Sequence, residues 1–175
     1  MNQEIYLGGR KIAADAPVFI VAEMSANHLQ DYDRAIKIIH AAKEAGADAI
    51  KLQTYTADTM TVDSDADCFI NKGGLWDGIK EYDLYKQAYT PWEWHAGLME
   101  EAKKCGLLCF SSPFDATAVD FLVQAGIFDE VMVSTDDPEI AELAKGAGAS
   151  VPFLRSAQTA NDYASTDDVI REVLE

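Results

Sequence analysis

Apolar runs and amphipathic stripes alternate along the chain. Residues 19–28, FIVAEMSANH, begin with four apolar residues without polar alternation, which is typical of a strand covered on both faces in a parallel sheet. In residues 31–46, alanines and isoleucines recur at helical spacing behind a capping Asp31, and Gly46 follows the last of them. The pattern therefore predicts a buried strand followed by an amphipathic helix.

The same strand-then-helix pattern recurs along the rest of the chain. Between the second strand and its helix, residues 57–90 hold several glycines and aromatics, and we predict a long irregular loop there, usually a functional feature. Five such units predict an α/β fold with parallel crossovers. Eight units would close a barrel, which typically needs about 250 residues, so 175 residues predict an open sheet or a partial TIM-type barrel. The further predicted strands are 48–55, 107–114, 129–135 and 151–155, and the further helices 91–106, 116–126, 138–148 and 166–175.

Charge and composition narrow the possible partners. The chain has 14 Lys and Arg against 30 Asp and Glu, a formal net charge of −16. So acidic a protein repels phosphate backbones and anionic lipids, which argues against nucleic-acid and membrane-surface binding. No apolar run approaches the roughly 20 residues of a transmembrane helix, and no signal peptide is recognisable, so we expect a cytoplasmic protein. Cys68, Cys105 and Cys109 lack zinc-site spacing, and we expect reduced thiols.

Polar residues gather where the first three predicted strands end. Parallel strands point their carboxyl ends toward one edge of the sheet, where function is concentrated in such folds. Lysine and hydroxyl groups together suit a phosphate or carboxylate, and a neighbouring acid can transfer protons. The alternative is that the acid and the lysine form an ion pair between neighbouring strands, since a buried unpaired lysine is costly. The candidates are Glu23, Asn27 and His28, then Lys51 and Gln53, then Ser111 and Ser112.

Three motifs in order, AE-x-x-x-NH, GAD-x-x-K-x-Q and S-S-PF, resemble the N-terminal part of the sialic acid synthase family over about residues 4–127. The resemblance implies a TIM barrel that condenses phosphoenolpyruvate with an N-acetylated aminosugar to a nonulosonic acid. It also implies a divalent metal, manganese or magnesium, that polarises the sugar aldehyde. The long loop at 57–90 would be the family's variable active-site loop.

The resemblance assigns roles to individual residues. It implies that Glu23 is the catalytic acid, that Lys51 grips phosphoenolpyruvate and that Gln53 faces the aminosugar. Ser112 would donate to phosphoenolpyruvate, and Asn27 and His28 would also bind substrate. The family's metal-binding histidines lie on later barrel strands, which this chain lacks. Since His28, His40 and His95 fall on separate elements with no paired spacing, we expect no tight metal site.

Beyond residue 127 the resemblance changes. The sequence now resembles acylneuraminate cytidylyltransferases. The resemblance is carried by the segments DEVMVSTDD and VPFLR and by a following pattern that includes Asp162, Thr166, Asp168 and Ile170. The sequence thus predicts a synthase-like part, 1–127, joined to a cytidylyltransferase-like part, 128–175. The shorter second part carries as much net negative charge as the first.

The function predicted by resemblance is a phosphoenolpyruvate-dependent nonulosonate synthase in an incomplete chain. The alternatives are a cytidylyltransferase fragment and a non-catalytic partner of a complete pathway enzyme. An open barrel leaves unpaired edges and an exposed apolar interior, so we also expect a homo-oligomer.

Overall fold

The computed structural model describes residues 5–13, 15–129, 131–161, 163–165, 169 and 172. The chain forms two compact units, Phe19–Ala118 and a second unit made of Met1–Val18 and Val119–Glu175. The first unit holds the residues predicted to carry chemistry.

A three-stranded parallel sheet forms the centre of the unit Phe19–Ala118. Its strands are β3 (Val21–Glu23), β4 (Ala49–Thr54) and β5 (Leu108–Pro113), in the order β3-β4-β5. The register pairs Glu23 with Lys51, and Gln53 with Ser112. The predicted parallel α/β arrangement is therefore confirmed for the first three strands. The expectation that the first of them is buried is wrong, because β3 is only three residues long and Val21 and Glu23 are exposed.

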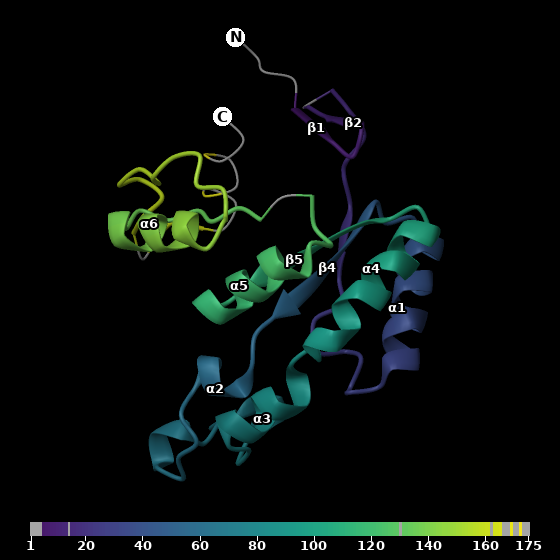
Figure 1. The fold of residues 1–175 in the computed structure, drawn as a ribbon. Coiled ribbons are helices and arrows are strands. Elements are labelled where there is room, and N and C mark those ends of the chain that lie inside the picture. The colour runs from purple at the N-terminus through teal and green to yellow at the C-terminus, as the bar shows by residue number, and fades with distance from the viewer. Residues whose placement is uncertain are drawn as a thin grey trace. The chain divides into compact units, whose positions relative to one another are not determined.

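Two helices, α1 (Tyr32–Glu44) and α4 (His95–Lys104), lie side by side against the sheet (Figure 1). The predicted cap of α1 is confirmed, because the Asp31 side chain accepts a hydrogen bond from the backbone N–H of Arg34 at 3.0 Å. A short 3-10 helix, Trp92–Trp94, leads into α4. The sequence predicts a single α-helix from residue 91, whereas the first turn of this segment is a 3-10 helix, which is wound more tightly than an α-helix.

The core of this unit lies between the sheet and the two helices. Alternation along β4 turns Ile50 and Leu52 toward the helices, and both are completely buried. They pack with Ile39 of α1 and with Leu98 and Ala102 of α4. The same alternation turns Lys51 and Gln53 to the opposite face of the sheet.

The prediction of an irregular loop at 57–90 is wrong in part. This stretch contains two α-helices, α2 (Ala57–Met60) and α3 (Glu81–Ala88), and two 3-10 helices, Asp67–Phe69 and Gly74–Trp76. Helix α3 has no side-chain cap and no fully buried residue, so the signals that mark a helix in sequence are weak there.

The second unit contains a β-hairpin that the sequence analysis did not predict. Strands β1 (Ile5–Leu7) and β2 (Arg10–Ile12) pair antiparallel through Gly8 and Gly9. Both glycines have positive φ, 56° and 80°, as a tight two-residue hairpin turn requires.

The fourth and fifth predicted strands are corrected by the structure. Isolated parallel bridges stand in place of regular strands: Met132 pairs with Ser150, just before the predicted fifth strand, and Thr135 pairs with Leu154 within it. Helix α6 (Pro138–Gly146) lies in the sequence between the two partners of each bridge. Too few successive pairs form here to make a regular strand. Helix α5 (Ala116–Ala125) matches its prediction, whereas most of the last predicted helix, 166–175, lies outside the described residues.

A search of the described residues finds no helix with the length and apolarity needed to cross a membrane.

Replacing Leu52 with alanine tests the packing of the sheet against the helices. We expect Leu52→Ala to lower the free energy of unfolding by about 2–5 kcal/mol, because it leaves a cavity under both helices. The matched control is Leu75→Ala, since Leu75 is 91% exposed and its loss should change stability by less than about 0.5 kcal/mol. Urea unfolding followed by circular dichroism measures both, and equal effects would contradict this packing.

Candidate functional site

Four of the predicted site residues share the face of the sheet that is turned away from the helices. Glu23 ends β3, Lys51 and Gln53 lie on β4, and Ser112 lies on β5. Residues paired in register project from the same face of a sheet. The parallel register therefore assembles one polar surface from three segments that are far apart in sequence.

The closest contact on this face joins the lysine and the acid. Lys51 Nζ donates a hydrogen bond to Glu23 Oε1 at 2.6 Å. This ion pair between neighbouring strands is the structural alternative that the sequence left open. The Lys51 side chain is 24% exposed and that of Glu23 is 56% exposed. A pair this accessible contributes about 0–1 kcal/mol, so stability alone gives little reason for a lysine at this position.

The surroundings of Lys51 suit an anion. An ammonium group carries three donors, and Glu23 Oε1 accepts one of them. Ser112 lies two residues beyond Phe110, the β5 partner of Lys51, and is paired with Gln53 in the register. An amide and a hydroxyl thus lie on the same face as the ammonium group.

Asn27 and His28 belong to a tight turn after β3 rather than to the polar face. The Asn27 amide donates to the carbonyl of Met24 at 3.0 Å. His28 is completely buried, and its Nδ1 accepts from the backbone N–H of Gln30 at 3.1 Å. Its Nε2 therefore carries the proton in the neutral ring and faces Thr90 Oγ1 at 3.3 Å. These contacts place both residues in the turn, and their predicted binding of substrate stays a prediction.

The same turn stores backbone strain. Ser25, Leu29 and Gln30 all have positive φ, between 48° and 57°. Such conformations cost non-glycine residues of the order of 1 kcal/mol each and are concentrated at functional sites. The turn follows Glu23 directly, so the strain lies beside the polar face.

A buried chain of hydrogen bonds behind the sheet was missed by the sequence analysis. His95 Nδ1 lies 3.2 Å from the carbonyl of Trp92, which only accepts, so Nδ1 donates. His95 Nε2 then accepts from Thr54 Oγ1 at 2.8 Å, and Thr54 accepts from Ser111 Oγ at 2.7 Å. Thr54 and Ser111 follow Gln53 and precede Ser112, so this chain holds both strand ends in place.

Comparison with known proteins identifies the lineage of this architecture. The sequence model of the NeuB family matches residues 38–149, more than half of the chain. The chain belongs to the NeuB family. A pseudaminic acid synthase of Campylobacter jejuni subsp. jejuni (serotype O:2) is 57% identical over 108 residues, which cover 62% of this chain and 32% of that protein. This chain thus spans about a third of the length of this curated relative.

Solved structures agree with the fold. A crystal structure of N-acetylneuraminic acid synthetase from Leptospira borgpetersenii serovar Hardjo-bovis, in complex with citrate, superposes with a TM-score of 0.63 at 28% identity. The match covers 98% of this chain and 54% of that one. The parallel βα units are therefore part of a synthase-type barrel, as the sequence predicted.

A second resemblance concerns a shorter stretch. A pseudaminic acid cytidylyltransferase of Campylobacter jejuni subsp. jejuni (serotype O:2) is 40% identical over 63 residues, 36% of this chain and 27% of that protein. The NeuB match continues to residue 149, beyond the junction that the sequence predicted near 127. The junction itself stays a prediction, and four residues of its supporting pattern, Asp162, Thr166, Asp168 and Ile170, lie outside the described residues.

NeuB synthases are metal-dependent, but the polar face does not fit a metal ion. Glu23 is the one carboxylate among its four residues, and Lys51 already occupies one of its oxygens. The ammonium group there repels a cation, and His28 uses both ring nitrogens elsewhere. The face of the sheet therefore suits an anion rather than a metal.

The buried histidines make stability depend on pH. Burial lowers the pKa of both His28 and His95 below 6.5, although backbone hydrogen bonds partly offset this for His95. Below about pH 6.5 the unfolded chain therefore binds protons that the folded chain does not, and stability falls as the pH falls. We expect the free energy of unfolding to decrease between pH 7.5 and 5.5, by at most about 1.4 kcal/mol per pH unit for each histidine.

Urea unfolding of the wild type and of His95→Gln across this range measures the effect. The variant should be less stable at pH 7.5 but should lose less on acidification, because one titrating group is gone. A wild-type stability that is flat or rises on acidification, or an equally steep loss in the variant, would contradict the assignment.

Proposed function

We propose that this chain provides the phosphoenolpyruvate-binding part of a nonulosonate synthase barrel. The observation that carries the proposal is the convergence of Glu23, Lys51, Gln53 and Ser112 on one sheet face of a NeuB-family chain. The identity to a pseudaminic acid synthase favours a product of the pseudaminic acid type.

In this proposal the residues divide the work by their chemistry. Lys51 binds the anionic groups of phosphoenolpyruvate as a point charge, and Ser112 donates its hydroxyl proton to them. Gln53 offers both a donor and an acceptor to an N-acetylated aminosugar. Glu23, more than half exposed and hydrogen-bonded to Lys51, transfers a proton at the reacting centre. Arrival of the substrate anion lets Lys51 exchange its partner, which frees Glu23.

The chain by itself is expected to bind phosphoenolpyruvate weakly and not to turn it over. The polar face does not fit the metal that the family uses, and it presents a single ammonium group, that of Lys51.

The same face also exposes apolar side chains. Val21 and Phe110 are 39% and 38% exposed, which supports self-association into a homo-oligomer.

Substitution of Lys51 tests the anion site. We expect Lys51→Met to weaken phosphoenolpyruvate binding roughly ten- to a hundred-fold, the effect of losing a charge-assisted hydrogen bond of about 1.5–3 kcal/mol. Ligand-observed NMR with unlabelled protein measures this even for weak binding. Stability should change by no more than about 1 kcal/mol, because the ion pair with Glu23 is accessible.

The matched control is Lys37→Met, which removes an exposed lysine from α1 and the same unit of charge. It should leave binding almost unchanged. Equal losses in the two variants would indicate a general charge effect, and no loss in Lys51→Met would refute the proposed site.

A second proposal concerns residues 128–175, which we infer to be related to cytidylyltransferases. A pseudaminic acid cytidylyltransferase is 40% identical over 63 residues of this chain. Within 128–175 the segments DEVMVSTDD and VPFLR carry the resemblance that supports this origin. We expect no activation of a sugar acid by CTP from this chain, because synthase-like sequence stands before residue 128, where the resemblance would place the phosphate loop of a cytidylyltransferase. Pyrophosphate release from CTP in the presence of a nonulosonic acid would contradict this, and would favour the cytidylyltransferase alternative over the synthase.

A further inference from the structure

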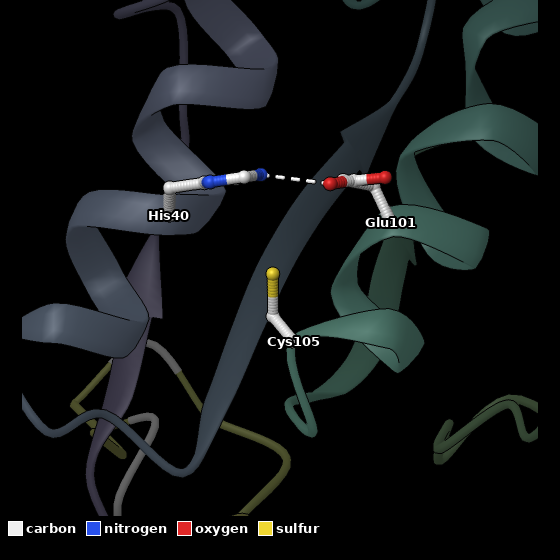
Figure 2. Close-up of side chains that lie close together, drawn as sticks. All are labelled: His40, Glu101 and Cys105. Carbon is white, nitrogen blue, oxygen red and sulfur yellow. Dashed lines mark hydrogen bonds and ion pairs between the residues drawn. The ribbon is translucent and has the colours of Figure 1, made fainter.

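A cluster of three metal-ligating side chains lies between α1 and α4, on the helical side of the sheet. Figure 2 shows His40 and Glu101 pointing toward one another across the two helices, with the Cys105 sulfur directed into the space beside them. His40 Nε2 lies 2.7 Å from Glu101 Oε1, and one ligand atom from each of the three residues lies within 4.8 Å of the others. None of these residues belongs to the polar face of the sheet.

The packing of the two helices fixes the backbone on which this cluster stands. His40 follows Ile39, and Glu101 precedes Ala102, and both of these neighbours are completely buried in the core. Cys105 caps the end of α4, where its backbone N–H donates to the carbonyl of Glu101 at 3.0 Å. The core therefore fixes the backbone positions of the three residues, and a metal ion has only their side chains to arrange.

We propose that His40, Glu101 and Cys105 form a zinc site that joins α1 to α4. This proposal departs from the expectation of no tight metal site, because packing of the two helices brings together ligands that have no paired spacing in the sequence. Imidazole nitrogen, carboxylate oxygen and thiolate sulfur are the ligands that zinc uses in proteins, at about 2.0–2.3 Å. In tetrahedral geometry these bond lengths separate the ligand atoms by roughly 3.3–3.6 Å. His40 Nε2 and Glu101 Oε1 are closer than this, at 2.7 Å, and the ligand atoms of all three residues lie within 4.8 Å of one another, so modest side-chain adjustments complete the site. Three protein ligands leave the fourth position to water.

Binding replaces a proton by the metal and involves no change of oxidation state. The Cys105 thiol releases its proton to solvent and gives a sulfur lone pair to zinc. The proton on His40 Nε2 leaves to solvent while Nδ1 keeps or takes up a proton, and the freed Nε2 lone pair binds zinc. The hydrogen bond between His40 and Glu101 is lost in exchange. Hydrogen bonding to His40 and the nearby Lys104 lower the pKa of Glu101, so its carboxylate is ionised at neutral pH.

The neighbouring lysines leave the required atoms available. Lys104 Nζ lies 3.1 Å from Glu100 and 3.5 Å from Glu101 Oε2, the oxygen that does not face His40. Lys43 Nζ donates to the carbonyl of Gly106 at 3.3 Å. The His40 side chain is 57% exposed and that of Glu101 is 23% exposed, so an ion reaches the site from solvent. A net charge of −16 favours the arrival of a cation.

The other described cysteines and histidines do not offer an equivalent site. Burial raises the pKa of the Cys109 thiol to about 12, which keeps it protonated at neutral pH. Cys68 is exposed, whereas His28 and His95 are buried and hydrogen-bonded. Within the described ranges, the search for three mutually close ligands finds this group alone.

Metal titration of the full chain, purified and stripped with a chelator, tests the proposal. Addition of Co²⁺ should produce a thiolate-to-cobalt charge-transfer band and the visible absorption of tetrahedral cobalt at one equivalent. Zn²⁺ should displace it, and competition with a chromophoric chelator then gives the zinc affinity. Zinc should also raise the unfolding midpoint, because it binds the folded chain across two helices.

Two pairs of matched variants assign the ligands. Cys105→Ser and Glu101→Gln should each weaken zinc binding at least about 10–100-fold, because removing even a residue that only hydrogen-bonds to a metal ligand has an effect of this size. Cys105→Ser should also abolish the charge-transfer band. The controls Cys68→Ser and Glu100→Gln should bind as the wild type does. Absence of a one-equivalent cobalt spectrum, or equal losses in the controls, would overturn the zinc site.

Discussion

The register of β4 against its two neighbours is the constraint on which this structure depends. Parallel hydrogen bonding pairs Glu23 with Lys51 and Gln53 with Ser112, and alternation sends Ile50 and Leu52 to the other face. A slip of one residue would exchange the two faces of β4 and place an ammonium group in the core. The apolar packing under α1 and α4 thus fixes the polar face on the opposite side of the sheet.

This constraint also accounts for the accessible ion pair. Lys51 lies on the face of the sheet that would line the interior of a full barrel. In our proposal this is where a small anionic substrate binds. The pair with Glu23 at 2.6 Å orients the lysine, and both partners remain accessible to solvent. The buried chain from His95 through Thr54 to Ser111 supports the same strand ends from behind. The ion pair on one face of the sheet and the hydrogen-bonded chain on the other thus both hold the strand ends that carry the site.

Much of this arrangement was predictable from sequence because it depends on local alternation. The apolar run at 19–22 marked β3, and an apolar run interrupted by Lys51 and Gln53 marked β4. Asp31 marked the beginning of α1. Helix α3 was not predicted, because it is short, uncapped and without a buried stripe. The strands expected at 129–135 and 151–155 have suitable residues, but only the bridge from Thr135 to Leu154 joins their described residues.

Contacts across long separations were beyond sequence reasoning. His95 lies 41 residues from Thr54, and His40 lies 61 residues from Glu101, so neither spacing resembles a motif. His28 matched a family motif, yet burial and two hydrogen bonds through its ring assign it to the turn after β3. Residues that act through packing between helices become visible only once the helices are placed side by side.

The central claim is that the polar face of β3, β4 and β5 is an anion-binding site. A two-dimensional ¹H–¹⁵N NMR titration with phosphoenolpyruvate tests it most directly, because it maps binding residue by residue without requiring turnover. We predict that the shifted amides cluster at Glu23, Lys51–Gln53 and Ser111–Ser112. Shifts that cluster instead in the second unit, or that are scattered over exposed lysines such as Lys37, would contradict the account.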